Sequence, residues 1–199
     1  MSNPNHANDG SSVVIVGSFA PVHRGHFDAI RAASRAVSEQ IEPVGSIILS
    51  PNSDEYLARK LRGKGEELSW TYDRRIDAIL EQSAPVEGVP TFVDDITGRY
   101  IGLEEINFEV PHTLRHSLGL AANRLFFVTG SDQLPSMQLH LQNPDNRSVC
   151  VLRPGHMEAL NEQLQQDWVV RAVQEGRYII TEREDMVNDI SSTNIRRSA

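Results

Sequence analysis

The sequence predicts an α/β fold, a single doubly wound parallel sheet with helices on both faces. Short apolar runs alternate along the chain with amphipathic stretches at helical spacing. Such alternation implies right-handed crossovers between parallel strands. The chain has 199 residues, 39% of them hydrophobic and 23% charged, which suits one folded domain with a substantial core. We therefore expect one domain over residues 13–199, preceded by a flexible, polar, turn-rich tail over residues 1–12.

The elements follow in order. The β-branched run at 13–16 predicts a strand buried on both faces. A helix is expected next, over 25–38, because its apolar residues share one stripe. That stripe consists of Phe27, Ile30, Ala33 and Val37. Further strands are expected at 47–49, 89–93, 125–128, 148–152 and 177–180, and further helices at 72–82, 113–122 and 157–174. In the helix over 72–82, Ile76, Ile79 and Leu80 are expected to face inward.

Charge and composition exclude several classes of function. The 19 basic and 27 acidic residues give a net charge of −8, which argues against nucleic acid as a partner because phosphate backbones need a basic surface. Cys150 is the single cysteine, so no intramolecular disulfide can form, and we expect it in the core. Without a membrane-length apolar run or a signal peptide, the expected location is cytoplasmic, with no membrane partner. Four histidines lack metal-ligand spacing and are expected at surfaces or helix ends: His112, His116, His140 and His156.

The string G-S-F-A-P-V-H-R-G-H, from Gly17 to His26, directly follows the first predicted strand. Ligands of open parallel sheets bind at the carboxyl ends of the strands. Gly17 allows a close approach of the backbone to a ligand, while Gly25 and His26 fall at a helix N-terminus, which favours phosphate. His23 and His26 can both donate hydrogen bonds to phosphate oxygens without a metal.

This string resembles the G-x-F-x-P-x-H-x-G-H signature of the nucleotidylyltransferase superfamily, whose members transfer a nucleoside monophosphate from ATP or CTP to a phosphate or carboxyl acceptor. The resemblance implies a Rossmann-like nucleotidylyltransferase fold. It also implies that His23 and His26 hold the triphosphate and stabilise charge on the α-phosphate. By the same resemblance, the ATP-binding residues of this loop are Gly17, Ser18, Phe19 and Gly25, and Ser18 and Phe19 also bind the acceptor.

A second motif, I-S-S-T-N-I-R over 190–196, places three hydroxyl residues before an arginine, which suits an anion at a helix start. It resembles the second signature of the superfamily, in the form most typical of enzymes that adenylylate nicotinate or nicotinamide mononucleotide. The resemblance assigns the β- and γ-phosphates of ATP to Ser191, Ser192, Thr193 and Arg196. The family usually continues with a full helix, whereas this chain stops at Ala199. We expect either a different closure of the phosphate site or a truncated sequence.

The middle segments carry weaker resemblances. P-N-S-D-E-Y, over 51–56, is similar to the P-x-x-D-x-Y segment of mononucleotide adenylyltransferases and implies an acceptor-binding role for Tyr56. Trp70 is expected either to stack on a pyridine ring or to flank the next helix as a partly buried aromatic. The family has an arginine near this helix start, close to the acceptor. We assign Arg74 to that position, with Arg75 as the competing match.

Two later segments complete the expected site. T-G-S-D-Q-L, over 129–134, resembles a G-A-D-x-L turn, so Gly130 and Asp132 are expected to bind ATP, with the carboxylate on the ribose or capping the next helix. Arg153 lies in V-L-R-P-G, which resembles a V-x-x-R-x-G loop, and is assigned to the acceptor, with simple exposure as the alternative. The segment 91–110 is longer and more acidic than the family pattern, so the substrate lid stays undefined.

The expected activity is transfer of AMP from ATP to nicotinamide or nicotinate mononucleotide, a reaction of NAD biosynthesis that releases pyrophosphate. Mg²⁺ is expected as a cofactor held mainly by ATP phosphates and waters, with no protein ligands of its own. Two alternatives remain: another phosphorylated acceptor, such as phosphopantetheine or a sugar phosphate, and a nucleotide sensor without turnover. The sequence does not decide whether the acceptor is nicotinate or nicotinamide mononucleotide. It also leaves open whether the protein forms a homo-oligomer.

Overall fold

The protein was analysed as a computed structural model, which describes residues 10–82, 84–96, 98, 114, 124–131, 140–152, 161–162 and 164–182. Its centre is a six-stranded sheet in the order β3-β2-β1-β4-β5-β6, and every neighbouring pair is parallel. The strands are β1 (Ser11–Gly17), β2 (Val44–Pro51), β3 (Thr91–Val93), β4 (Leu125–Gly130), β5 (Arg147–Leu152) and β6 (Tyr178–Glu182). The order reverses direction between β1 and β4, so the topological switch point lies at the carboxyl end of β1.

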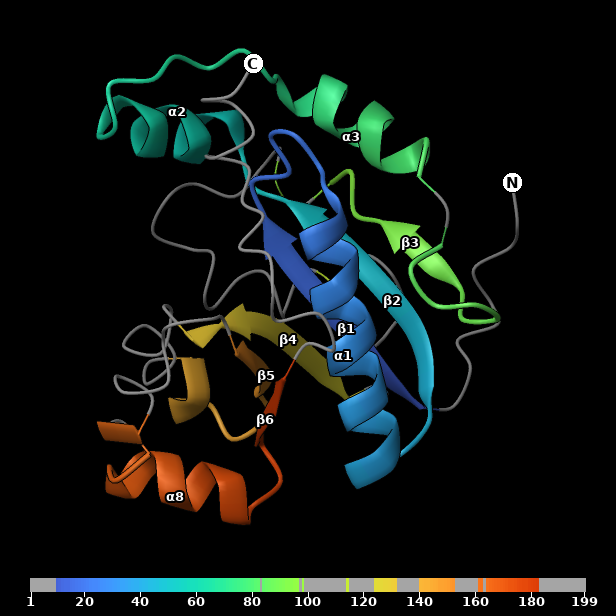
Figure 1. The fold of residues 1–199 in the computed structure, drawn as a ribbon, viewed down its shortest axis with the longest axis vertical. Helices are drawn as coiled ribbons and strands as arrows, with labels where there is room; N and C mark the ends of the chain where they lie inside the picture. Colours follow the sequence, from blue (N-terminus) through green and yellow to red (C-terminus); the bar gives the residue numbers. More distant parts are fainter. Residues whose placement is uncertain are drawn as a thin grey trace.

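Helices lie on both faces of this sheet. They are α1 (Arg24–Gln40), α2 (Asp54–Arg62), α3 (Tyr72–Leu80) and α8 (Asp167–Gln174). Figure 1 shows α1 running across one face, with α2 and α3 at the end of the molecule where α1 begins. α3 packs against β2 and β3, whereas α8 packs against β6. The predicted fold class, a doubly wound parallel sheet, is confirmed.

Successive side chains of β1 point to opposite faces of the sheet, and both faces are covered, which explains why the strand is a continuous apolar run. Val13 and Ile15 join the core under α1, together with α1 residues such as Ile30. Val14 packs on the opposite face, in a cluster that includes Leu114. A strand with both faces covered needs apolar residues at successive positions. The central position of β1 in the sheet therefore follows from its sequence.

Most of the predicted elements match observed ones, and the stripe of α1 is buried as expected. Two expectations are wrong. The helix predicted over 157–174 is interrupted at 164–166, because Gln166 has an extended backbone and caps α8, which begins at Asp167. Leu80 does not face inward but is 64% exposed at the last residue of α3, where the buried stripe instead contains Arg75. The helix predicted over 113–122 lies mostly outside the described residues.

His140 lies near the end of a helix, one of its two expected places, but it is not at the surface. It is buried, with 3% of its surface exposed, and its ring meets Phe127 edge-on at 5.0 Å between centroids. The Nδ2 of Asn146 donates to the carbonyl of His140 at 2.9 Å. The ring nitrogens also have polar neighbours, as buried ones require: Nδ1 lies 3.5 Å from Nδ2 of Asn146, and Nε2 lies 3.4 Å from the carbonyl oxygen of Arg147. Cys150, by contrast, is fully buried in β5, where it was expected.

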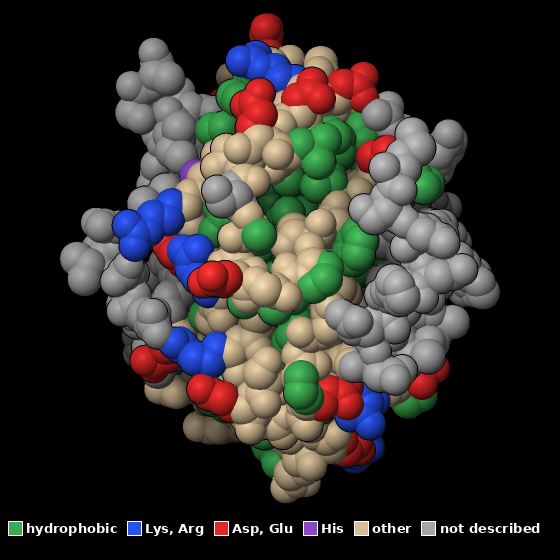
Figure 2. All heavy atoms as spheres, turned by 90° about the vertical axis from the view of Figure 1, so that its right-hand side faces the viewer, with side chains coloured by type: hydrophobic (Ala, Val, Ile, Leu, Met, Phe, Trp, Pro, Cys, Tyr) green, Lys and Arg blue, Asp and Glu red, His purple; other side chains and the backbone are tan. Residues whose placement is uncertain are grey.

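Figure 2 shows hydrophobic side chains exposed on the side of the molecule where β3 and α3 lie in Figure 1. The large apolar side chains exposed on or beside these two elements are Leu80, Phe92 and Ile96. No helix among the described residues combines the length and apolar character needed to cross a membrane.

Candidate active site

The loop between β1 and α1 lies at the topological switch point. β1 ends at Gly17 and α1 begins at Arg24 with His23 as its N-cap. Gly130 ends the neighbouring strand β4, and the pairing of Ile15 with Val128 brings the ends of the two strands to the same level. Open parallel sheets bind their ligands at such a strand reversal, outside the carboxyl ends of the strands. The structure thus brings Gly17 and Gly130 to one edge of the sheet.

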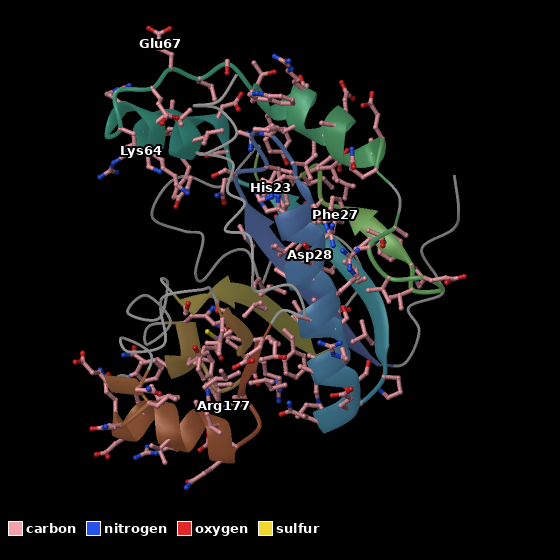
Figure 3. All side chains as sticks on the ribbon, in the orientation of Figure 1. His23, Phe27, Asp28, Lys64, Glu67 and Arg177 are labelled. Atoms are coloured by element: carbon pink, nitrogen blue, oxygen red, sulfur yellow. The ribbon has the colours of Figure 1, made fainter. Side chains whose placement is uncertain are left out.

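His23 and His26 form the polar centre of this loop. Both rings are half-buried, and they stack with centroids 3.8 Å apart. The backbone N–H of His23 donates to Nδ1 of His26 at 3.2 Å, and the N–H of His26 donates to the carbonyl of His23 at 3.0 Å. Since Nδ1 of His26 accepts a bond, its neutral ring carries the proton on Nε2, which makes that atom a donor. Figure 3 shows His23 at the start of α1.

Phe19 shapes the loop beneath the histidines. It is fully buried and has a φ of 47°, in the left-handed region that bulky residues rarely adopt. Its ring centroid lies 4.8 Å from that of His26. A β-carbon at Gly17 would come within 3.3 Å of the Phe19 ring, so glycine there leaves room for this packing. A strained backbone held by its surroundings is a common feature of functional loops.

Two neighbouring elements contact this loop from the side of β2, namely the end of β2 and α2. The N–H of Asn52 donates to the carbonyl of Gly17 at 2.9 Å, just after β2. Lys60 of α2 lies with Nζ 3.5 Å from Oγ of Ser18. Lys60 was not among the predicted site residues. Its position in α2, after the P-x-x-D-x-Y segment, was the available signal, because a helix following this strand end returns past the loop.

Arg74 and Trp70 lie together at the start of α3. The Arg74 guanidinium stacks 4.1 Å above the centroid of the indole ring, and its Nη1 donates to the carbonyl of Ser69 at 3.2 Å. Trp70 is half-buried and packs against a small cluster that contains Ala20, a residue of the β1–α1 loop. This places the aromatic ring beside the loop, with the exposed Arg74 on one of its faces.

Arg75, the competing match, lies in a different environment. Its side chain is 0% exposed. Nη1 donates to the carbonyl of Ser18 at 3.0 Å, and Nη2 pairs with Oδ1 of Asp54 at 2.8 Å. Of the two arginines, only Arg74 is accessible to a ligand in this structure, whereas Arg75 lies behind the loop.

A second polar network closes the carboxyl end of β3. Asp94 is buried, accepts a hydrogen bond from Oγ of Ser50 at 2.8 Å, and its carbonyl accepts one from the hydroxyl of Tyr72 at 3.1 Å. A β-carbon at Gly98 would lie only 2.1 Å from the carbonyl oxygen of Pro51, so the chain passes directly against the end of β2 there. This network joins β2, β3 and α3 next to the loop.

The remaining predicted residues divide into two groups. Gly25 is buried in the first turn of α1, and Tyr56 is half-buried in α2, where its N–H donates to Oγ of the N-cap Ser53 at 3.1 Å. The second group lies outside the described residues: Asp132, Arg153, Ser191, Ser192, Thr193 and Arg196. In the part of the chain that the structure describes, no three His, Cys, Asp or Glu side chains gather closely enough to hold a metal ion.

The described geometry suits an anion. The N-terminus of a 17-residue helix presents the positive end of its dipole. Two imidazoles and the ammonium of Lys60 lie around the same loop. Donors fixed in this way can stabilise charge that develops on a phosphate. The fold and this loop define the class of the protein: an α/β nucleotide-binding protein equipped for chemistry at phosphate.

Comparisons with known proteins specify this class. The chain belongs to the cytidylyltransferase-like family, whose model matches residues 14–198. Among solved structures, 24 chains match. One is the Plasmodium falciparum nicotinic acid mononucleotide adenylyltransferase complexed with APC, with a TM-score of 0.57 and 14% identity over 94% of this chain and 83% of that one. At this identity the likeness is one of fold. No curated protein matches the sequence. Membership of the nucleotidylyltransferase superfamily is thereby confirmed.

Proposed function

We propose that the protein is an adenylyltransferase that transfers AMP from ATP to nicotinamide or nicotinate mononucleotide, forming the dinucleotide and pyrophosphate. The observation that carries the proposal is the pair His23 and His26, stacked at the start of α1 at the switch point of the sheet. Family membership supports nucleotidyl transfer as the reaction. The solved adenylyltransferase of the same fold, complexed with APC, supports a pyridine mononucleotide as the acceptor and ATP as the donor.

In the proposed mechanism, a phosphate oxygen of the acceptor attacks the α-phosphorus of ATP in line. A bond forms between that oxygen and the α-phosphorus, and the bond to the bridging oxygen breaks, so pyrophosphate leaves with the electron pair. The attacking oxygen is already anionic near neutral pH, so no general base is needed. The role of the protein is positioning and electrostatic stabilisation. His26, with its proton on Nε2, would donate to this charge, and the positive end of the α1 dipole would add to its stabilisation.

Three further contributions belong to the proposal. Arg196 and the hydroxyls of Ser191, Ser192 and Thr193 would hold the β- and γ-phosphates. Mg²⁺ would arrive with ATP and be held through phosphate oxygens and water, where it offsets negative charge on the triphosphate. Trp70 and Lys60 would receive the ring and a phosphate of the acceptor, a role supported by their contacts beside the loop.

The test is a product assay with purified protein, Mg²⁺ and ATP, supplied in turn with nicotinate mononucleotide, nicotinamide mononucleotide, phosphopantetheine and a sugar phosphate. Pyrophosphate and the coupled product are measured together, and a parallel set replaces ATP with CTP. We expect dinucleotide from at least one pyridine mononucleotide, and none when EDTA removes Mg²⁺. Product only from another acceptor would reassign the substrate. Tight ATP binding without any product would contradict the proposal and support a nucleotide sensor.

A further inference from the structure

Arg75 joins three elements behind the β1–α1 loop. It stands in α3, its Nη2 bonds Asp54 at the start of α2, and its Nη1 bonds the carbonyl of Ser18 in the loop. Its guanidinium also lies 5.3 Å from the ring centroid of Tyr72. No surface of the Arg75 side chain is exposed, so a bound acceptor would meet the loop and not this arginine.

The burial of this charge needs an explanation. Removing a guanidinium from water is costly, and Asp54, its one carboxylate partner among the described residues, is 41% exposed and therefore partly screened. A well-packed apolar side chain of similar volume would serve stability at least as well. What the guanidinium adds is direction, because its planar fork fixes two acceptors in one geometry. One of those acceptors is the backbone of the loop.

A short series of contacts connects the carbonyl of Ser18, held by Arg75, to the two histidines. The peptide that it belongs to precedes Phe19, whose φ of 47° depends on the orientation of that peptide. The Phe19 ring packs against Gly17 on one side and lies 4.8 Å from the ring of His26. His26 in turn accepts a bond from the N–H of His23 and stacks on its ring. A turn of the Ser18 peptide would therefore move both imidazoles.

We propose that Arg75 is a positioning residue for the histidine pair. It holds the carbonyl of Ser18, and through Phe19 the imidazole of His26, in the orientation that receives the α-phosphate. This inference rests on the proposed function for its catalytic meaning. It assigns to Arg75 a role behind the loop, distinct from contact with the acceptor.

Arg177 provides a matched control. Its Nη1 donates to the carbonyl of Leu141 at 2.8 Å and its Nη2 lies 2.6 Å from Oε2 of Glu175, so it also bonds one carbonyl and one carboxylate. It precedes β6, and Figure 3 shows it at the opposite end of the molecule from His23. The variants are Arg75→Met, Arg75→Lys, Asp54→Asn and Arg177→Met.

Two readouts are taken on each folded variant. The first is the NMR signals of the His23 and His26 rings in the protein without substrate, assigned by single His→Gln variants. The second is kcat and KM for both substrates. We expect Arg75→Met to shift both ring signals and to lower kcat about 10- to 100-fold, since small misplacements of catalytic groups cost that much, with little change in KM for ATP. Arg75→Lys and Asp54→Asn should shift the signals less, and Arg177→Met should leave signals and kcat unchanged while lowering Tm.

Unchanged histidine signals in the Arg75 variants, or an equal change in Arg177→Met, would overturn the inference and leave Arg75 a purely structural residue. If Arg75→Met does not fold, Arg75→Lys and Asp54→Asn decide the question by the same criteria, since Asp54 is half-exposed and its amide keeps the shape of the site. If the wild-type protein makes no dinucleotide, the proposed function fails, while the ring signals still test the positioning role.

Discussion

Histidines lie at both ends of the sheet, in surroundings of different kinds. At the carboxyl end of β1, His23 and His26 are half-buried, stack on each other and belong to the first turn of a helix. At the amino end of β5, His140 is almost fully buried, with its ring against Phe127 and its backbone bonded to Asn146. Each histidine has polar neighbours, but only the first two lie at the N-terminus of a long helix.

The contrast between these histidines reflects their positions in a parallel sheet, where ligand binding is expected at the carboxyl ends of the strands and not at the amino ends. At the carboxyl ends, loops diverge where the strand order reverses, and polar side chains there can face a ligand. Before β5, the chain instead folds back on itself, and Nδ2 of Asn146 donates to the carbonyl of His140 and lies 3.5 Å from Nδ1 of its ring. We therefore expect the same side chain to have a functional role in one place and a structural role in the other.

The largest effect is expected from a substitution in the histidine pair at the carboxyl end of β1. His26→Ala removes the donor at Nε2 and the acceptor for the N–H of His23. We expect kcat for dinucleotide formation to fall about 100- to 1,000-fold, as for loss of one preorganised charge-stabilising donor. Steady-state pyrophosphate release measures this, with circular dichroism as the check on folding. Near-normal turnover would remove His26 from the mechanism.

The substitution His140→Ala tests whether the buried histidine before β5 has a structural role. This change leaves a cavity beside Phe127 and deprives Asn146 of a polar neighbour. We expect the free energy of unfolding to drop by about 2 kcal/mol, measured by urea denaturation. Turnover per folded molecule should stay unchanged. A large loss of kcat in this variant would contradict the division between the two ends of the sheet.

Asp132→Ala asks whether the neighbouring strand β4 contributes to the same site. The residue follows shortly after Gly130, the last residue of β4. If its carboxylate accepts ribose hydroxyls, removing it should raise the Kd for ATP about tenfold, the effect of one charged hydrogen bond. Isothermal titration calorimetry measures the affinity. An unchanged Kd would limit Asp132 to capping the following chain.

Lys60→Gln should give the smallest effect. Lys60 is exposed, so solvent and salt screen its charge, and its contact with Oγ of Ser18 is long. We expect KM for the mononucleotide to rise about two- to fivefold, the range of an exposed ion pair, with kcat unchanged. The difference from wild type should shrink as ionic strength increases. A rise that is independent of salt would mean that Lys60 acts through the loop and not through its charge.

The fold could be predicted largely from local patterns. The apolar run at 13–16 and the stripe of α1 each reflect burial within one element, and their alternation implies the parallel sheet. The errors arise where tertiary contacts decide. Leu80 fits the helical pattern, but α3 ends there and leaves it in solvent, and the extended backbone of Gln166 divides a pattern that looked continuous.

The site was predictable to a similar extent. His23 and His26 stand in one short motif next to a strand, so their proximity is a local property. Lys60 and Arg75 reach Ser18 across 42 and 57 residues of sequence, which depends on how α2 and α3 fold back over the end of β2. The sequence assigned the arginine position at the start of α3 to Arg74 with Arg75 as a competing match, and the buried face of α3 is what distinguishes the two arginines.

The pairing of β1 with β4 has a consequence for how the protein acquires its site during synthesis. β1 pairs with β2 early in the chain, but its other partner begins at Leu125. Contacts between distant segments form slowly because a long loop must close first. β1, α1 and β2 are therefore synthesised well before β4, the strand on the other side of the switch point, is present. We expect nucleotide binding to appear only once β4 has paired with β1. The affinity for nucleotide would therefore measure whether strands β1–β3 and β4–β6 have joined into one sheet.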